Sequence, residues 1–403
     1  MTLGFWIPAG SRDESPDLAG VTHFLEHLLF KGTRRYTAEQ IAQIFDTLGG
    51  ELNAATSKEY VVVYGRFLDE QLETALDVLT EMLLEPTFAD LDREREVILE
   101  EIAMYEDSPQ DLVHDLLADT VFDSHPLGRP VLGTTESIAS MSEEMIREYH
   151  RINFDFSHMV VAAAGHVDHD HLKQLLLQTH DGRTASPRPH RDESQPHIVS
   201  RQAFLRKETE QLHVCLGAEG LPRNDERRYV LSVLDSLLGG SMSSRLFQEV
   251  REKRGLAYSI FSFCNMYRET GLCGIYFGTR PDRAPEVMQT VVEQVEAMRT
   301  RPVERAELER AKEHLKGRTV LAMESTPNRM IRLGKSILHE TEILSLDEIT
   351  ARIDAVGPED VRDLAAQIFE PESVSVAGIG ADESRFARAV EAGSLPEGDR
   401  DVR

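Results

Sequence analysis

The spacing of apolar residues along the first part of the chain predicts alternating strands and helices. Residues 3–8 and 56–67 have the apolar and β-branched content of strands. Apolar residues that recur at helical spacing predict helices over residues 37–48, 69–84 and 90–105. This mixture of elements predicts an α+β fold.

The second half of the chain repeats this order of elements. Residues 307–310 are similar to residues 90–93, and residues 374–378 are similar to residues 161–165. Similar segments in similar order predict two copies of one α+β unit.

A polar stretch that contains Gly182, Pro187 and Pro189 separates the two copies. Residues 181–196 carry almost no apolar side chains, which is typical of a linker. We therefore expect a first domain over residues 1–180, a linker over residues 181–196 and a second domain over residues 197–403.

A short helix in the first copy carries two histidines and a glutamate. His23 and His27 are four residues apart, so on a helix they share one face, with Glu26 beside them. Two neutral imidazoles suit a catalytic zinc ion, and a nearby carboxylate can act as a base. The order is the inverse of the common zinc-peptidase motif. The alternative is a helix whose histidines merely have this spacing.

The predicted helix over residues 90–105 carries an acidic run in which a third metal ligand would be found. Seven residues separate Glu94 from Glu101, so these two share a face. A solvated charged stripe is the alternative interpretation.

The second copy has different residues at these positions. Ser232, Asp235 and Ser236 replace the two histidines and the glutamate, and Arg318 lies near the position of Glu101. We therefore expect a metal only in the first half.

Composition narrows the classes of partner and location. The formal net charge of −26 argues against nucleic-acid binding. Apolar runs are much shorter than the roughly 18 residues of a membrane span, and the three cysteines do not form a Cys-x-x-Cys pair. The start of the chain does not have the pattern of a secretory leader, so we expect a cytoplasmic protein that binds neither nucleic acid nor membrane.

At this point the chain resembles the pitrilysin and insulin-degrading family of inverted-motif zinc metallopeptidases. It is most similar to the branch with mitochondrial processing peptidase and its bacterial homologues. The resemblance rests on residues 10–14, 20–32, 53–57, 94–101 and 243–258. It implies two homologous α/β-sandwich halves, each a mostly antiparallel sheet flanked by helices, that face each other across a cleft.

The resemblance also implies the metal ligands. One Zn²⁺ per chain would be held by His23, His27 and Glu101, with Glu94 behind the ligands. Glu100 is the nearest rival to Glu101, but it lies about 100° away around the helix and does not share the face of Glu94.

The resemblance implies catalytic roles on both halves. Glu26 would activate the zinc-bound water, and Arg251 with Tyr258, seven residues apart, would reach the oxyanion from the second half. A surface arginine and a buried tyrosine are the alternative for this pair.

Asn53, Ala54 and Ala55 match the sheet edge that binds extended substrate in the family. A loop that enters the following strand is the alternative.

The family also has a leading strand before residues 3–8. Because Met1 falls where the inner strand begins, either the reading frame starts too late or the first domain lacks that leading strand. In the second case we expect its sheet to have an exposed edge or a missing neighbour.

A second histidine cluster is a competing metal candidate. His166, His169 and His171 alternate with Asp168 and Asp170. We favour a turn and helix start capped by Asp168 over a second metal site.

The sequence therefore predicts a zinc endopeptidase that hydrolyses peptides or unstructured polypeptide segments. The alternative is a catalytically silent subunit or structural partner of an active peptidase. For either function we expect a homodimer or a heterodimer with a related chain.

Overall fold

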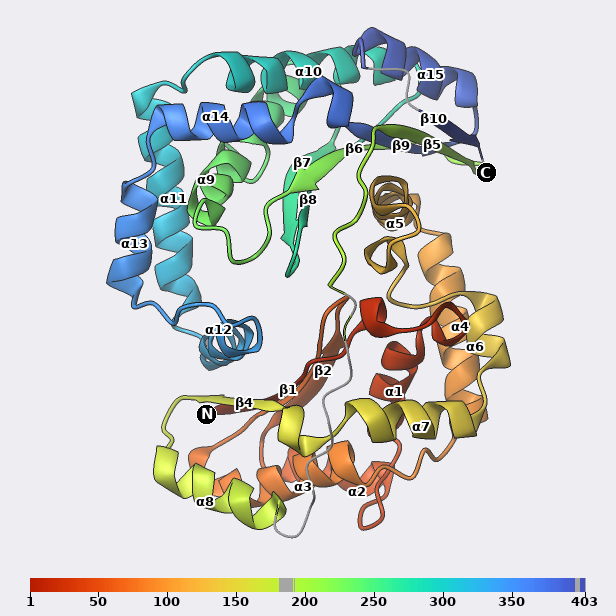
Figure 1. Ribbon diagram of the computed structural model, residues 1–403, viewed down its shortest axis with the longest axis vertical. Helices are drawn as coiled ribbons and strands as arrows, with labels where there is room; N and C mark the ends of the chain where they lie inside the picture. Colours follow the sequence, from red (N-terminus) through yellow and green to blue (C-terminus); the bar gives the residue numbers. More distant parts are fainter. Residues whose placement is uncertain (181–190, 192, 396–398, 403) are drawn as a thin grey trace. The chain divides into compact units, whose positions relative to one another are not determined.

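The computed structural model describes residues 1–180, 191, 193–395 and 399–402. The described residues form two compact units, each with one sheet and its own helices (Figure 1). Unit 1 comprises Met1–Met104, Arg129–Asp192 and Leu321–Ile343, and unit 2 comprises Tyr105–Gly128, Glu193–Val320 and Leu344–Arg403. Each unit therefore contains a segment that lies in the other half of the sequence.

The sheet of unit 1 is entirely antiparallel. Its strands follow the order β2 (Glu51–Thr56), β3 (Val61–Arg66), β1 (Thr2–Ile7) and β4 (Val160–Ala164). The single strand expected over residues 56–67 is wrong in its bounds, because a turn at residues 57–60 separates β2 from β3. Strand β2 is an edge of this sheet.

Helices cover both faces of the sheet in unit 1. On one face, Phe5 and Val63 pack in a core with Leu25 of α1 and Leu79 of α3. Helix α12 lies on the other face (Figure 1). There Trp6 packs with residues of α12. The helices of this unit are α1 (Val21–Leu29), α2 (Ala38–Thr47), α3 (Leu72–Leu84), α4 (Leu91–Glu106, which ends in unit 2), α6 (Thr135–Ser140), α7 (Glu143–Asn153), α8 (His169–His180) and α12 (Thr326–Leu338).

Two glycines allow α12 to lie close to the sheet. A Cβ atom at Gly334 would lie 2.0 Å from Trp6 Nε1, and one at Gly4 would lie 2.4 Å from Met330 Sδ. A larger residue at either position would push the helix away from β1.

The sheet of unit 2 is mixed. Its strands follow the order β10 (Asp399–Val402), β5 (Arg201–Arg206), β9 (Ser375–Gly380), β6 (Leu212–Gly220), β8 (Gly271–Thr279) and β7 (Ser259–Met266). Strand β5 is parallel to β9 and β10, and the other neighbours are antiparallel.

The helices of unit 2 also lie on both faces of its sheet. One face packs against α9 and α10, and Val113, Leu117 and Val121 of α5 pack on the other face. The helices are α5 (Pro109–Phe122), α9 (Arg228–Leu238), α10 (Ala284–Thr300), α11 (Arg305–Ala322), α13 (Leu346–Asp354), α14 (Pro358–Ile368) and α15 (Glu383–Ala392). The predicted α+β class, with mostly antiparallel sheets flanked by helices, is confirmed.

Helices α5 and α12 occupy equivalent places in the two copies, since α5 follows the long helix α4 and α12 follows the long helix α11. Helix α5 packs on β5, β6 and β9 in unit 2, whereas α12 packs on β1 and β4 in unit 1.

The predicted linker over residues 181–196 falls mostly outside the described residues, so the predicted boundary stays a prediction. No described helix is long and apolar enough to cross a membrane.

Candidate metal centre

The helix that carries the histidine motif, α1, is capped by a side chain from the preceding loop. Both oxygens of the Glu14 carboxylate accept main-chain N–H bonds, one from Gly20 and one from Thr22, each at 2.8 Å. Gly20 has φ 88°, a left-handed conformation that favours glycine. Burial raises the pKa of Glu14 to about 7. This loop therefore fixes where α1 begins.

Three predicted metal ligands converge in unit 1. His23 Nε2 lies 3.1 Å from Glu101 Oε2, and His27 Nε2 lies 3.5 Å from the same oxygen. One ligand atom from each residue lies within 4.8 Å of the other two. Within the part of the chain that the structure describes, this is the one group of histidine, cysteine, aspartate or glutamate side chains with such spacing.

The two distances from the histidine nitrogens to Glu101 Oε2 fit the donor spacing of a tetrahedral zinc site. With bonds of about 2.0–2.1 Å, two ligands of tetrahedral zinc lie about 3.3 Å apart. The hydrogen bond from the His23 ring holds the pKa of the Glu101 carboxyl below its usual range. Glu101, not Glu100, faces the histidines, and Glu100 is exposed on α4. The residues present therefore fit a metal ion with two nitrogen donors and one oxygen donor.

Glu94 lies behind His27, where it forms a buried link to a lysine. Its Oε2 is 3.4 Å from His27 Nδ1, and its Oε1 is 2.8 Å from Lys31 Nζ. The side chain of Glu94 is only 5% exposed. Sequence reasoning missed Lys31, although its position four residues after His27 and eight after His23 could have indicated it.

Glu26 is held by a residue of the edge strand. The hydroxyl of Thr56, the last residue of β2, donates a hydrogen bond to Glu26 Oε2. Sequence reasoning missed Thr56, because nothing in its local pattern links it to α1.

Asn53 and Ala55 are exposed on β2, and Asn53 Oδ1 accepts the main-chain N–H of Ala54 at 2.8 Å.

Arg251 and Tyr258 lie together in unit 2. Arg251 belongs to a π-helical turn at Phe247–Glu252, and its guanidinium carbon lies 4.2 Å from the centre of the Tyr258 ring. Tyr258 is 77% exposed, so the expected alternative of a buried tyrosine is wrong. The role of this pair toward a substrate stays a prediction.

The second histidine cluster pairs with acidic residues of another segment. His166 forms a hydrogen bond with Asp69, and His171 Nε2 lies 4.0 Å from Glu73 Oε1. Asp168 Oδ1 accepts the main-chain N–H of His171 at 2.8 Å, which is the expected cap of α8.

Comparisons with known proteins identify the family of this chain. Residues 1–135 match the family described as insulinase (peptidase family M16), and residues 140–315 match its companion, the peptidase M16 inactive domain. An uncharacterized zinc protease of Streptomyces coelicolor is 44% identical over 387 residues, which cover 94% of this chain and 84% of that protein. Another from Bacillus subtilis is 41% identical over 371 residues, with 92% and 90% covered.

Solved structures show the same fold at low sequence identity. A peptidase M16 inactive domain from Pseudomonas fluorescens has a TM-score of 0.88 at 21% identity, and a protease from Helicobacter pylori has a TM-score of 0.87 at 20% identity. In both comparisons 94% of this chain and 93% of the other chain are covered. The chain therefore belongs to the insulinase family of peptidases, family M16.

Proposed function

We propose that this protein is a zinc-dependent endopeptidase that hydrolyses peptides or unstructured polypeptide segments. The observation that carries the proposal is the convergence of His23, His27 and Glu101, whose donor atoms lie within 4.8 Å of one another, with Glu26 next to His27 on the same helix. The names of the relatives as zinc proteases support the choice of metal. One zinc ion per chain is proposed.

Each protein side chain has a defined task in this proposal. His23, His27 and Glu101 would hold a zinc ion, which would supply Lewis acidity toward a peptide carbonyl and a water molecule. Glu26 accepts a proton from the attacking water and delivers it to the leaving amine. Glu94, paired with Lys31, holds His27 through Nδ1 so that Nε2 faces the other donors.

The edge of β2 is the proposed site for the substrate main chain. An extended peptide that pairs with Asn53, Ala54 and Ala55 would add a strand to the sheet with little dependence on its side chains. Arg251 and Tyr258 are proposed donors to the developing oxyanion, and Tyr258→Phe, which removes only a hydroxyl, should lower kcat.

The alternative is a catalytically silent subunit, and the name of the matched inactive-domain family does not support it. That match covers residues 140–315, a segment that contains none of the three donors or Glu26. The name fits a second copy without ligands and does not bear on the first.

We also propose a cytoplasmic location and assembly as a homodimer or with a related chain.

The test measures zinc by elemental analysis together with cleavage of an internally quenched, unstructured peptide. We expect cleavage that is sensitive to chelators and restored by zinc. Glu26→Gln should keep the metal and lose at least about 100-fold in rate, the contribution of a general base. Glu101→Gln should lose the metal, whereas its exposed neighbour Glu100→Gln should keep both metal and rate. A metal-free purified protein that still cleaves, or a Glu26→Gln variant as fast as the wild type, would contradict the proposal.

A further inference from the structure

We propose that Thr56 is a positioning residue that holds the carboxylate of Glu26 and joins it to the edge strand β2. This inference rests on the proposed peptidase function and adds a residue to it. The Thr56 hydroxyl donates to Glu26 Oε2, and Thr56 is the only hydrogen-bonding partner of the Glu26 side chain among the described residues. The bond connects two elements that are separated by 30 residues in the sequence.

In the hydrogen bond between Thr56 and Glu26, the threonine hydroxyl is the donor. An ionised carboxylate only accepts hydrogen bonds, so the threonine hydroxyl is the donor. The bond occupies Oε2 and leaves Oε1 of Glu26 without a protein partner among the described residues. One oxygen is therefore anchored, and the other stays available for the proton of a water molecule.

The hydroxyl of Thr56 is placed by the sheet. Thr56 pairs with Val61 of β3, and it lies on the same face of β2 as Leu52 and Ala54, which pack toward the core that includes α1. A β-branched side chain on a fixed strand has few χ1 rotamers. The donor is therefore preorganised, and a long flexible glutamate side chain is oriented by it.

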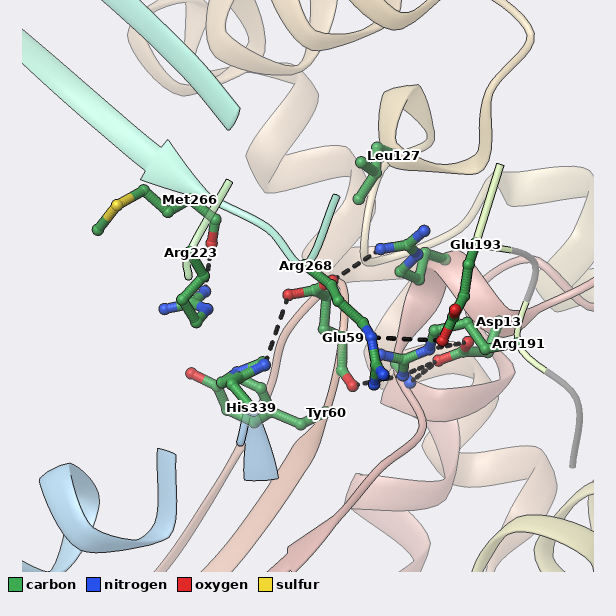
Figure 2. Close-up of polar contacts among 12 residues, drawn as sticks. Asp13, Glu59, Tyr60, Leu127, Arg191, Glu193, Arg223, Met266, Arg268 and His339 are labelled. Carbon is green, nitrogen blue, oxygen red and sulfur yellow. Dashed lines mark hydrogen bonds and ion pairs between the residues drawn. The ribbon is translucent and has the colours of Figure 1, made fainter. Parts of the chain in front are cut away.

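The turn after Thr56 is anchored at a buried carboxylate, that of Glu59. Arg12 Nη1 lies 2.7 Å from Glu59 Oε1, and His339 Nδ1 lies 4.0 Å from Glu59 Oε2. The main-chain oxygen of Glu59 accepts a hydrogen bond from Arg191 at 2.7 Å (Figure 2). Three segments of unit 1 therefore hold the turn that follows β2. Thr56, at the end of β2, has little freedom to move away from Glu26.

This arrangement gives one strand two tasks. The edge of β2 is the proposed partner of the substrate main chain, and the final residue of β2 orients the base. A peptide paired with β2 is therefore positioned relative to Glu26 by a single strand. Loss of the Thr56 hydroxyl should affect the chemical step more than substrate binding.

The experiment compares Thr56→Val, which keeps the shape and removes the hydroxyl, with Thr56→Ser, which keeps the hydroxyl. We expect Thr56→Val to lower kcat about 10- to 100-fold, as loss of a hydrogen bond to a charged group implies, with KM changed less than about 2-fold. Its zinc content and melting temperature should match the wild type. Thr56→Ser should recover kcat to within about 3-fold of the wild type, since the donor is retained.

Thr47→Val is the matched control, because the hydroxyl of Thr47 bonds only the main-chain oxygen of Gln43 on α2. An active wild type with an unchanged kcat for Thr56→Val would overturn the inference and leave the proposed function intact. Equal losses in Thr56→Val and Thr56→Ser would also overturn it, because the hydroxyl would not be the cause. A zinc-loaded wild type that cleaves no peptide would overturn the proposed function and this inference together.

Discussion

At the scale of single residues, the candidate metal centre depends on side chains that do not touch the metal position. His27 is joined through Glu94 to Lys31, and both contacts of Glu94 lie within 3.4 Å. A buried carboxylate between an imidazole and an ammonium group fixes the orientation of the ring. Lys31 therefore supports the candidate metal site from just beyond the end of α1.

Lys31→Met should weaken zinc binding about 10- to 100-fold, because Glu94 loses its charge partner and holds His27 less firmly. Competition with a chelator of known zinc affinity measures the change. Lys173→Met, which removes an exposed lysine from α8, is the control and should bind zinc like the wild type. Equal zinc affinities for Lys31→Met and Lys173→Met would show that Lys31 has no such role.

A second residue-scale effect concerns the acid stability of unit 1. His150 packs against Phe88 and Phe154, and its Nε2 donates to the Leu83 carbonyl oxygen at 2.8 Å. Burial of the ring lowers the pKa of His150 to about 4 from 6.5. The unfolded chain therefore binds the proton more tightly than the folded chain between these two values.

The consequence is a loss of stability in acid. The contribution of His150 is complete above pH 6.5 and is lost as the pH falls toward 4, with a change of at most about 3 kcal/mol. Urea unfolding of the wild type and of His150→Gln from pH 4 to pH 8 measures it. A glutamine at this position keeps a donor for the Leu83 carbonyl oxygen and does not titrate. The free energy of unfolding of His150→Gln should therefore fall less steeply than that of the wild type below pH 6.5. Above that pH the two free energies should change in parallel. Parallel curves over the whole range would exclude the effect.

At the scale of elements, the position of α12 depends on close packing against β1. Trp6 is fully buried, and the helix approaches it at Gly334, where the space for a Cβ atom is already filled. The ring of Trp6 has little room to shift, because its surroundings are packed. The glycine is therefore a packing requirement of this helix.

Gly334→Ala should destabilise the protein by about 1–3 kcal/mol, because it overpacks the contact with Trp6. Gly317→Ala is the matched control on α11, where a Cβ atom meets nothing within 4 Å. Alanine has the higher helix propensity, so this control should be more stable by about 0.5–1 kcal/mol. Denaturant melts of both variants give the comparison, and a Gly334→Ala variant at least as stable as the wild type would contradict the packing argument.

At the scale of the whole molecule, each compact unit depends on both halves of the sequence. Residues 1–180 include α5, which packs on the sheet of unit 2, and lack α12, which covers one face of the sheet of unit 1. A fragment of the first half would therefore expose Trp6 and its neighbours and carry an apolar helix without its partner sheet.

Residues 1–180 and residues 197–403, produced separately, should fail to show a cooperative thermal melt, because each leaves large apolar faces in water. Co-expression of the two fragments should restore the melt and the peptidase activity. The intact protein cleaved within residues 181–196 is the control, since it retains every described helix of both units. A cooperative melt of residues 1–180 alone, near the temperature of the full chain, would contradict the expectation.

The sequence by itself determined the local part of the candidate metal centre. The four-residue step from His23 to His27 and the seven-residue step from Glu94 to Glu101 follow from the helical period, which depends only on neighbouring residues. The α+β class was predictable from the periodicity of apolar residues, and the internal repeat from similar segments in similar order. The tertiary structure decided that Glu94 reaches Lys31, that Thr56 reaches Glu26, and that α5 and α12 each pack on the sheet of the other copy. These contacts join segments far apart in the chain, and their energy comes from packing and hydrogen bonds between elements, which local spacing does not encode.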